Sequence, residues 1–342
     1  MRKELLLLGA FGMLTTATLC AQEFHLQPTP QEYITQKDSV DIPRQYQILS
    51  GNSVQDGPAL PLLRSLMPEE VLGASFRVYI GVKGDKIIKK YQHRIPRKSE
   101  GYFLKIEKDC IVIAGADERG AYYGVQTLAQ LLALDKLPLA EVTDYPDVPY
   151  RGVVEGFYGA PWSQEACIRQ LDFYGRNKMN VYIYGPKDDP YHRTPNWRKP
   201  YPAREGEELK VLVNRAKENN VIFYWAIHPG QDIRWNEEDR SLLLQKFESM
   251  YQLGVRGFAV FFDDISGEGT KADKQAELLN YIDDHFVKVK RDVAPLILCP
   301  TEYNKSWTDV EGGYLTTLGD KLNEGIKVMW TGDMVVATID KS

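Results

Sequence analysis

A repeat in the second half of the chain constrains the fold more than any other feature. Six short apolar segments are expected to be strands, and they begin near Gly152, Val181, Val221, Gly257, Pro295 and Lys327. Their starts lie 29, 40, 36, 38 and 32 residues apart, the size of one strand–helix unit, and amphipathic helical patterns lie between them. Residues 258–262 form a continuous apolar run, which is typical of a strand buried on both faces. Such units form a parallel sheet, either doubly wound or closed into a barrel.

The barrel is the better interpretation, because no glycine-rich phosphate-binding fingerprint follows the first strand. We therefore predict an α/β fold with a (β/α)8 TIM-type barrel, of which about six βα units are present. Closing the barrel would take about two more units of roughly 30–40 residues each. An open arc of six strands would leave strand edges exposed at Gly152 and at Lys327.

A small α/β domain is predicted to precede the barrel. Strand-like segments cover 75–81, 101–106 and 110–115, and the last two are expected to pair antiparallel across a turn at 107–109. A helical pattern follows over 120–132. The proline-rich segment 145–149 marks a boundary, so we assign 22–147 to the N-terminal domain and 148–342 to the barrel domain, which is expected to be incomplete at its C-terminus.

Residues 1–21 have the pattern of a signal peptide. A short basic head precedes the apolar stretch 5–19, and a cleavage site after Ala21 predicts export to the periplasm or the medium. Cys20 raises the alternative of a lipid anchor, although Leu19 fits that signal poorly. No apolar run reaches the roughly 18 residues of a membrane span, so an integral membrane protein is not expected.

The net charge and the cysteine spacing argue against a nucleic-acid-binding protein, a zinc protein and a disulfide-stabilised protein. A formal net charge of −5 with mixed signs argues against a nucleic-acid partner, which requires a basic face. Beyond the signal peptide the chain has Cys110, Cys167 and Cys299, and their spacing fits neither a zinc site nor a disulfide framework. We expect buried free thiols, no metal and no cofactor. The sequence leaves the oligomeric state unknown.

Polar residues gather where the barrel strands end, whereas the strand interiors have almost none. The segments that follow the strands are 155–158, 185–189, 228–232, 263–264, 301–304 and 331–333. In a barrel these ends face one shared mouth, where active sites lie. This asymmetry predicts an enzyme.

Three Asp-Asp pairs occur, and their surroundings differ. The pair at 283–284 lies in a helical pattern and is expected on a solvated face, whereas the pair at 188–189 lies in a proline-flanked turn. Asp263 and Asp264 directly end the most apolar strand. Both reach the mouth only if the chain bends there, and Gly267 and Gly269 favour a bend. We predict that 263–264 is functional rather than a helix cap or loop ion pair.

Two carboxylates in one pocket repel each other, so one stays ionised while the other holds a proton near neutral pH. That arrangement suits acid/base cleavage of a glycosidic bond. A metal-dependent hydrolase remains the alternative, with Glu155 and Asp333 as further ligands. His228 is interpreted as an oriented structural histidine, and Lys187 as either a surface charge or a substrate hydrogen-bond donor.

Three motifs together resemble glycoside hydrolase family 84, over essentially the whole chain that follows the signal peptide. They are RGVVEGFYGAPW at 151–162, YGPKDDPY at 184–191 and FFDDI at 261–265. The family contains bacterial relatives of O-GlcNAcase, which are β-N-acetylglucosaminidases, and some are described as hyaluronidases. The resemblance implies an exported, retaining hydrolase whose nucleophile is the substrate's own 2-acetamido oxygen, with an oxazoline intermediate and no cofactor.

The resemblance also implies roles for individual residues. Asp263 would orient the acetamido group, and Asp264 would serve as general acid and then general base. Five further residues would bind substrate: Gly156 and Lys187 at sugar hydroxyls, Tyr303 at the acetamido oxygen, and Tyr158 and Thr331 along its pocket. The partner would be a GlcNAc-bearing glycan or glycoprotein. A truncated, inactive GlcNAc-binding fragment is the second hypothesis, since sugar-holding residues that the family places on later strands fall beyond position 342.

Overall fold

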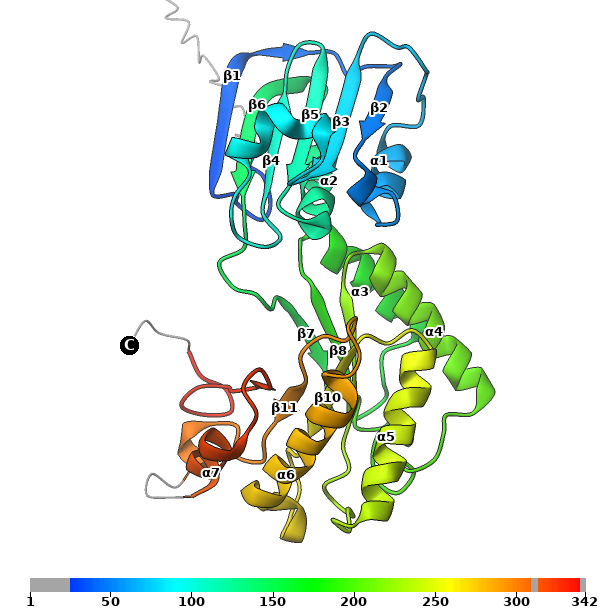
Figure 1. Ribbon diagram of the computed structural model, residues 1–342, viewed down its shortest axis with the longest axis vertical. Helices are drawn as coiled ribbons and strands as arrows, with labels where there is room; N and C mark the ends of the chain where they lie inside the picture. Colours follow the sequence, from blue (N-terminus) through cyan, green and yellow to red (C-terminus); the bar gives the residue numbers. More distant parts are fainter. Residues whose placement is uncertain (1–24, 309–312, 339–342) are drawn as a thin grey trace, which may run out of the picture.

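A computed structural model of the protein describes residues 25–308 and 313–338. The expected signal peptide at 1–21, with Cys20, lies outside the described residues. Figure 1 shows two sheets stacked along the long axis of the molecule, the N-terminal sheet above the second.

The N-terminal sheet has six strands of mixed direction in the order β1-β6-β4-β5-β3-β2. Its elements are β1 (Glu32–Val40), β2 (Gln47–Ser50), α1 (Ala59–Leu66), β3 (Arg77–Val82), β4 (Tyr102–Ile106), β5 (Cys110–Gly115), α2 (Glu118–Leu132) and β6 (Leu137–Asp144). The predicted hairpin is confirmed, since β4 and β5 pair antiparallel from Tyr102↔Gly115 to Ile106↔Ile111. The helix predicted from Gly120 begins two residues earlier, because the Asp117 side chain caps it and accepts a hydrogen bond from the Gly120 N–H at 2.8 Å.

The second sheet is a parallel half-barrel of six strands in the order β12-β11-β10-β9-β8-β7. Its strands are β7 (Gly152–Glu155), β8 (Val181–Tyr184), β9 (Ile222–Ile227), β10 (Gly257–Phe261), β11 (Ile297–Cys299) and β12 (Lys327–Val328). The helices between them are α3 (Gln164–Arg176), α4 (Ala203–Glu218), α5 (Glu237–Gln252), α6 (Ala272–Ile282) and α7 (Tyr314–Lys321). The prediction of about six βα units is confirmed, and β7 and β12 are the two edges of the sheet.

The two faces of the half-barrel sheet have separate cores. On one face Tyr182, Trp225 and Val260 pack against the helices, which cover that side in Figure 1. On the other face alternate residues of the same strands, among them Ile183 and Phe261, form a smaller apolar cluster. Both faces are buried, which explains why the strands are continuous apolar runs rather than alternating ones.

Polar contacts join the half-barrel to the N-terminal sheet at the start of its first two strands. Arg151, just before β7, donates to Glu100 at 2.7 Å, and Asn180, just before β8, donates to Glu100 at 3.0 Å. Lys178 forms a buried ion pair with Asp144 at 2.8 Å. Because the N-terminal ends of the strands face the first sheet, their C-terminal ends point away from it.

Cys110, Cys167 and Cys299 are free thiols as expected, and Cys167 and Cys299 are buried, but Cys110 is only half-buried, contrary to the expectation. Within 25–308 and 313–338, no helix is both long and apolar enough to cross a membrane.

Candidate active site

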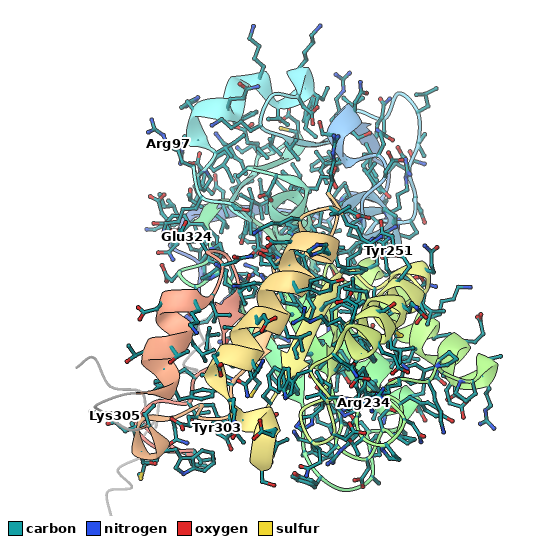
Figure 2. All side chains as sticks on the ribbon, turned by 60° about the horizontal axis from the view of Figure 1, so that its bottom comes forward. Arg97, Arg234, Tyr251, Tyr303, Lys305 and Glu324 are labelled. Carbon is teal, nitrogen blue, oxygen red and sulfur yellow. The ribbon has the colours of Figure 1, made fainter. Side chains whose placement is uncertain are left out.

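The candidate site lies on the inner face of the half-barrel, at the C-terminal ends of its strands. Strand residues alternate between faces, and Ala226 and Phe261 belong to the inner cluster. Continuing the alternation by two positions brings His228 and Asp263 to the same side. Figure 2 shows Tyr303, which follows β11, at the opposite end of the molecule from Arg97 of the N-terminal region. The site therefore opens away from the first sheet.

Asp263 is held by a buried lysine. The Lys187 ammonium lies 2.6 Å from Oδ2 of Asp263, and the Lys187 side chain is only 1% exposed. This resolves the choice left open by the sequence, because Lys187 is not a surface charge. The Nε2 atom of His228 lies 2.7 Å from the main-chain oxygen of Asp263 and 3.5 Å from Oδ1. Oδ1 itself has no hydrogen-bond partner among the described residues.

The electrostatics of this cluster favour an ionised Asp263. Burial by itself would raise the pKa of the carboxyl group, but the neighbouring His228 ring and the Lys187 charge outweigh burial. The pKa of Asp263 is lowered as a result from 3.8 to about 2. Asp263 is thus a carboxylate with one oxygen bound to an ammonium and the other buried without a hydrogen-bond partner among the described residues.

Asp264 has a different environment although it is the next residue. Its backbone is left-handed, with φ of 54°, and its side chain is exposed. The Tyr158 hydroxyl donates to Oδ2 of Asp264 at 3.3 Å. The left-handed turn lets two consecutive side chains reach one mouth, so the predicted bend exists. It lies at Asp264 itself, ahead of the glycines that we expected to provide it.

Two tyrosines border the carboxylate pair. Burial and the charges of Asp264 and Asp263 raise the pKa of Tyr303 to about 12, which places this phenol in the field of both carboxylates. Burial and Asp264 also raise the pKa of Tyr158. Both phenols therefore remain protonated hydrogen-bond donors at neutral pH.

The remaining expected substrate-binding residues lie nearby. Thr331 donates from its N–H to the Tyr303 main-chain oxygen at 2.9 Å and from its hydroxyl to the Met334 main-chain oxygen at 2.9 Å. Gly156 directly follows β7, and a Cβ there would lie 3.9 Å from the Phe261 ring. The structure thus brings Asp263, Asp264, Lys187, Tyr158 and Tyr303 together, with Thr331 behind Tyr303 and Gly156 beside Phe261.

Two features of this region were not predicted from the sequence. Gly185 has to be glycine, because a Cβ there would come within 2.9 Å of the Phe261 ring and 3.0 Å of the Ala226 Cβ. His228 was interpreted as structural, but it touches Asp263 directly. Its position two residues beyond an inner-facing strand residue is the signal that could have identified it.

The structure corrects two expectations about acidic residues. The side chain of Glu155 faces the helices, where it accepts hydrogen bonds from the Trp162 N–H at 2.8 Å and from the Tyr182 hydroxyl. Burial raises its pKa, and it does not reach the mouth as the metal-site alternative requires. The pair at 283–284 is also not a uniformly solvated face, because Asp283 is 5% exposed while Asp284 is exposed.

The described residues offer no cluster of metal ligands beside the carboxylate pair. Asp333, the other ligand considered, lies at the surface, where Lys305 is 3.7 Å away. Across the described ranges, no three His, Cys, Asp or Glu side chains gather in a way that could hold a metal ion. The Asp263 and Asp264 pair has an ammonium and a phenol as its neighbours.

Comparisons with known proteins give consistent matches. Residues 151–342 match the family model for beta-N-acetylglucosaminidase, and residues 23–145 match domain 2 of glycosyl hydrolase family 20. Protein O-GlcNAcase of Rattus norvegicus is 37% identical over 195 residues, which make up 54% of this chain and 21% of that protein.

Solved structures match more of the chain. CpGH84B has a TM-score of 0.86 and 36% identity, covering 92% of this chain and 57% of its own length. CpGH84D has a TM-score of 0.84 and 28% identity, covering 94% of this chain and 57% of its own length. The chain thus spans about a fifth of the rat protein and just over half of each solved chain.

Proposed function

Since the chain belongs to the beta-N-acetylglucosaminidase family, glycoside hydrolase family 84, we propose that it hydrolyses terminal β-linked GlcNAc with retention of configuration. The substrate class is a GlcNAc-bearing glycan or glycoprotein. The proposed nucleophile is the oxygen of the substrate's 2-acetamido group. The observation that carries this proposal is the contrast between two adjacent carboxylates, one held ionised by Lys187 and one exposed beside Tyr158.

Asp263 is assigned to the acetamido group. Oδ2 is bound to Lys187, and the buried Oδ1 has no hydrogen-bond partner among the described residues, so we assign Oδ1 to accept a hydrogen bond from the substrate's amide N–H. An ionised acceptor at the amide nitrogen makes the amide oxygen more nucleophilic. It also stabilises the positive charge that develops when that oxygen attacks the anomeric carbon. A low pKa serves this role, because Asp263 has to stay ionised throughout the cycle.

Asp264 is assigned to proton transfer. In the first step the amide oxygen bonds to the anomeric carbon, the glycosidic bond breaks, and Asp264 donates a proton to the leaving oxygen. This produces the oxazoline. In the second step Asp264 takes a proton from water as the water attacks the same carbon, which opens the ring and restores the acetamido group. The exposure of Asp264 allows both the leaving group and water to reach it.

The other residues are assigned to binding and orientation. Tyr303 donates to the acetamido oxygen during attack, and its raised pKa keeps that proton in place. Lys187 has three N–H donors, so it can bind Asp263 and a sugar hydroxyl at once. The Gly156 backbone binds a second hydroxyl, while Tyr158 and Thr331 line the acetamido pocket.

Two further points belong to the proposal. Export to the periplasm or medium rests on the sequence of residues 1–21. A GlcNAc-binding role without turnover is the second candidate, and it is favoured by the open sheet, whose edges β7 and β12 have no neighbouring strand among the described residues.

Turnover by the purified chain distinguishes the two candidates. The unmodified chain should release the aglycone from aryl β-N-acetylglucosaminides. Asp264→Ala should lose far more activity on substrates with poor leaving groups than on activated ones, because only poor leaving groups need the proton. Asp284→Ala is the matched control, since that aspartate is exposed and bound to Lys288 at 2.7 Å. Equal loss on both substrate classes would refute the acid role, and binding without turnover would favour the second candidate.

A further inference from the structure

A buried histidine beneath the carboxylate pair has no role in the steps above. His228 follows β9 and is 1% exposed. Its Nε2 atom lies 2.7 Å from the main-chain oxygen of Asp263, a distance that requires Nε2 to carry a hydrogen. Its other nitrogen, Nδ1, is buried and has no hydrogen-bonding partner among the described residues. A hydrogen on Nδ1 would therefore be buried without an acceptor, which favours the neutral ring with hydrogen on Nε2 alone.

The chain around His228 is fixed by a second buried histidine. His228 donates its main-chain N–H to the His192 oxygen at 2.7 Å, and Nδ1 of His192 lies 3.3 Å from the Ala226 main-chain oxygen. These two hydrogen bonds, one between main-chain groups and one from the His192 side chain, join residue 192 to the end of β9. The two rings lie 6.4 Å apart, and burial lowers the pKa of His192 to about 3. His192 is accordingly neutral and fully buried, and its ring contacts the Ala226 main-chain oxygen rather than Asp263.

His228 contacts the main-chain oxygen of Asp263, directly before the left-handed turn of the backbone at Asp264. The Asp263 carbonyl belongs to the peptide bond that leads into Asp264, where the backbone turns left-handed. An aspartate in this conformation is held at some cost by the surrounding structure. A hydrogen bond to that carbonyl fixes the peptide plane, and the peptide plane sets the directions in which both carboxylates leave the chain.

We propose that His228 is a positioning residue for Asp263 and Asp264, acting as a neutral Nε2–H donor to the peptide that joins them. The inference rests on the proposed hydrolase function. A neutral donor leaves Lys187 as the cation bound to Asp263, and the buried oxygen Oδ1 keeps no hydrogen-bond partner among the described residues, so it can accept from the substrate's amide.

Variants can separate this contact from ring packing. His228→Gln keeps an N–H at the reach of Nε2, whereas His228→Leu fills the space without a donor. We expect His228→Leu to lower kcat by about 10- to 100-fold with a smaller change in KM, since a misplaced catalytic group costs about that much. His228→Gln should recover most of kcat. His192→Asn, which keeps a donor toward Ala226, is the matched control and should retain wild-type kcat. An equal fall in His192→Asn, or no recovery in His228→Gln, would overturn the proposal.

A second measurement does not depend on turnover. Long-range ¹H–¹⁵N correlation spectra of the full chain, with the His228 signals identified by their loss in His228→Gln, report which ring nitrogen carries hydrogen. The expected result at pH 7 is a neutral ring with hydrogen on Nε2. An Nδ1–H tautomer or an imidazolium would overturn the inference even if the chain hydrolyses GlcNAc. A neutral Nε2–H ring in a chain without turnover would instead contradict the proposed function alone.

Discussion

Replacing Lys187 with methionine removes the charge that balances Asp263 while nearly preserving side-chain volume. The ion pair is 2.6 Å long, and its side chains are 1% and 15% exposed, so solvent screens it little. The pKa of Asp263 is lowered from 3.8 to about 2, which corresponds to roughly 2 kcal/mol of preference for the ionised form. Since this pKa is depressed, its contribution to stability is present above about pH 4 and is lost as the pH falls toward 2.

Without Lys187 the depression of the Asp263 pKa weakens, because burial is then opposed only by the His228 ring. We expect Lys187→Met to lower the free energy of unfolding at pH 7 by about 3–5 kcal/mol, the usual cost of leaving one partner of a buried pair unpaired. The pKa of Asp263 should rise in the variant. The deficit should therefore be largest at pH 7 and shrink as the pH falls toward 4, where the carboxyl group takes up a proton.

Urea unfolding of wild type, Lys187→Met, Asp263→Asn and the double variant between pH 4 and 8 provides the assay. The double variant removes both charges and should recover most of the stability lost in Lys187→Met. This cycle needs no turnover. A Lys187→Met chain as stable as wild type at pH 7, or a deficit independent of pH, would refute the electrostatic account of Asp263.

Other predictions address the remaining parts of the site and the fold. Tyr303→Phe should lower kcat by about 10- to 100-fold through loss of one donor to the developing charge, and the wild-type pH–rate profile should show no Tyr303 ionisation below about pH 11, because the pKa of Tyr303 is about 12. Lys178→Met should lower the free energy of unfolding by about 3–5 kcal/mol in urea titrations, since it leaves Asp144 buried and unpaired; unchanged stability would contradict the assigned contact. Activity should survive exhaustive chelation followed by dialysis, and loss that zinc or magnesium restores would favour the metal-dependent alternative.

Much of the architecture could be predicted from periodicity. All six strands of the half-barrel begin within two residues of the predicted positions, because strands buried on both faces are uninterrupted apolar runs. The resemblance drawn from the three motifs is confirmed by the family model that matches 151–342. The division into domains at 147 and the signal peptide stay predictions.

The direction of individual side chains was harder to predict. Glu155 is the last residue of β7, and Asp263 lies two residues beyond the end of β10. Glu155 nevertheless lies on the helix side, because successive strand residues alternate between the two faces and the face of each depends on where the strand begins. Asp264 reaches the mouth through a left-handed residue, which no apolar pattern indicates. The burial of Lys187 and the role of His228 depend on contacts between strands far apart in sequence, so local patterns could not assign them.

Participation of the substrate's amide is the central claim, and a series of substrates tests it most directly. The aryl β-glycosides of N-acetyl-, N-fluoroacetyl-, N-difluoroacetyl- and N-trifluoroacetylglucosamine differ little in size, but each fluorine makes the amide oxygen a weaker nucleophile. If that oxygen attacks the anomeric carbon, log(kcat/KM) for the chain should fall steeply and steadily along the series. A flat dependence on fluorine content would contradict the account and would place the nucleophile on the protein or on water.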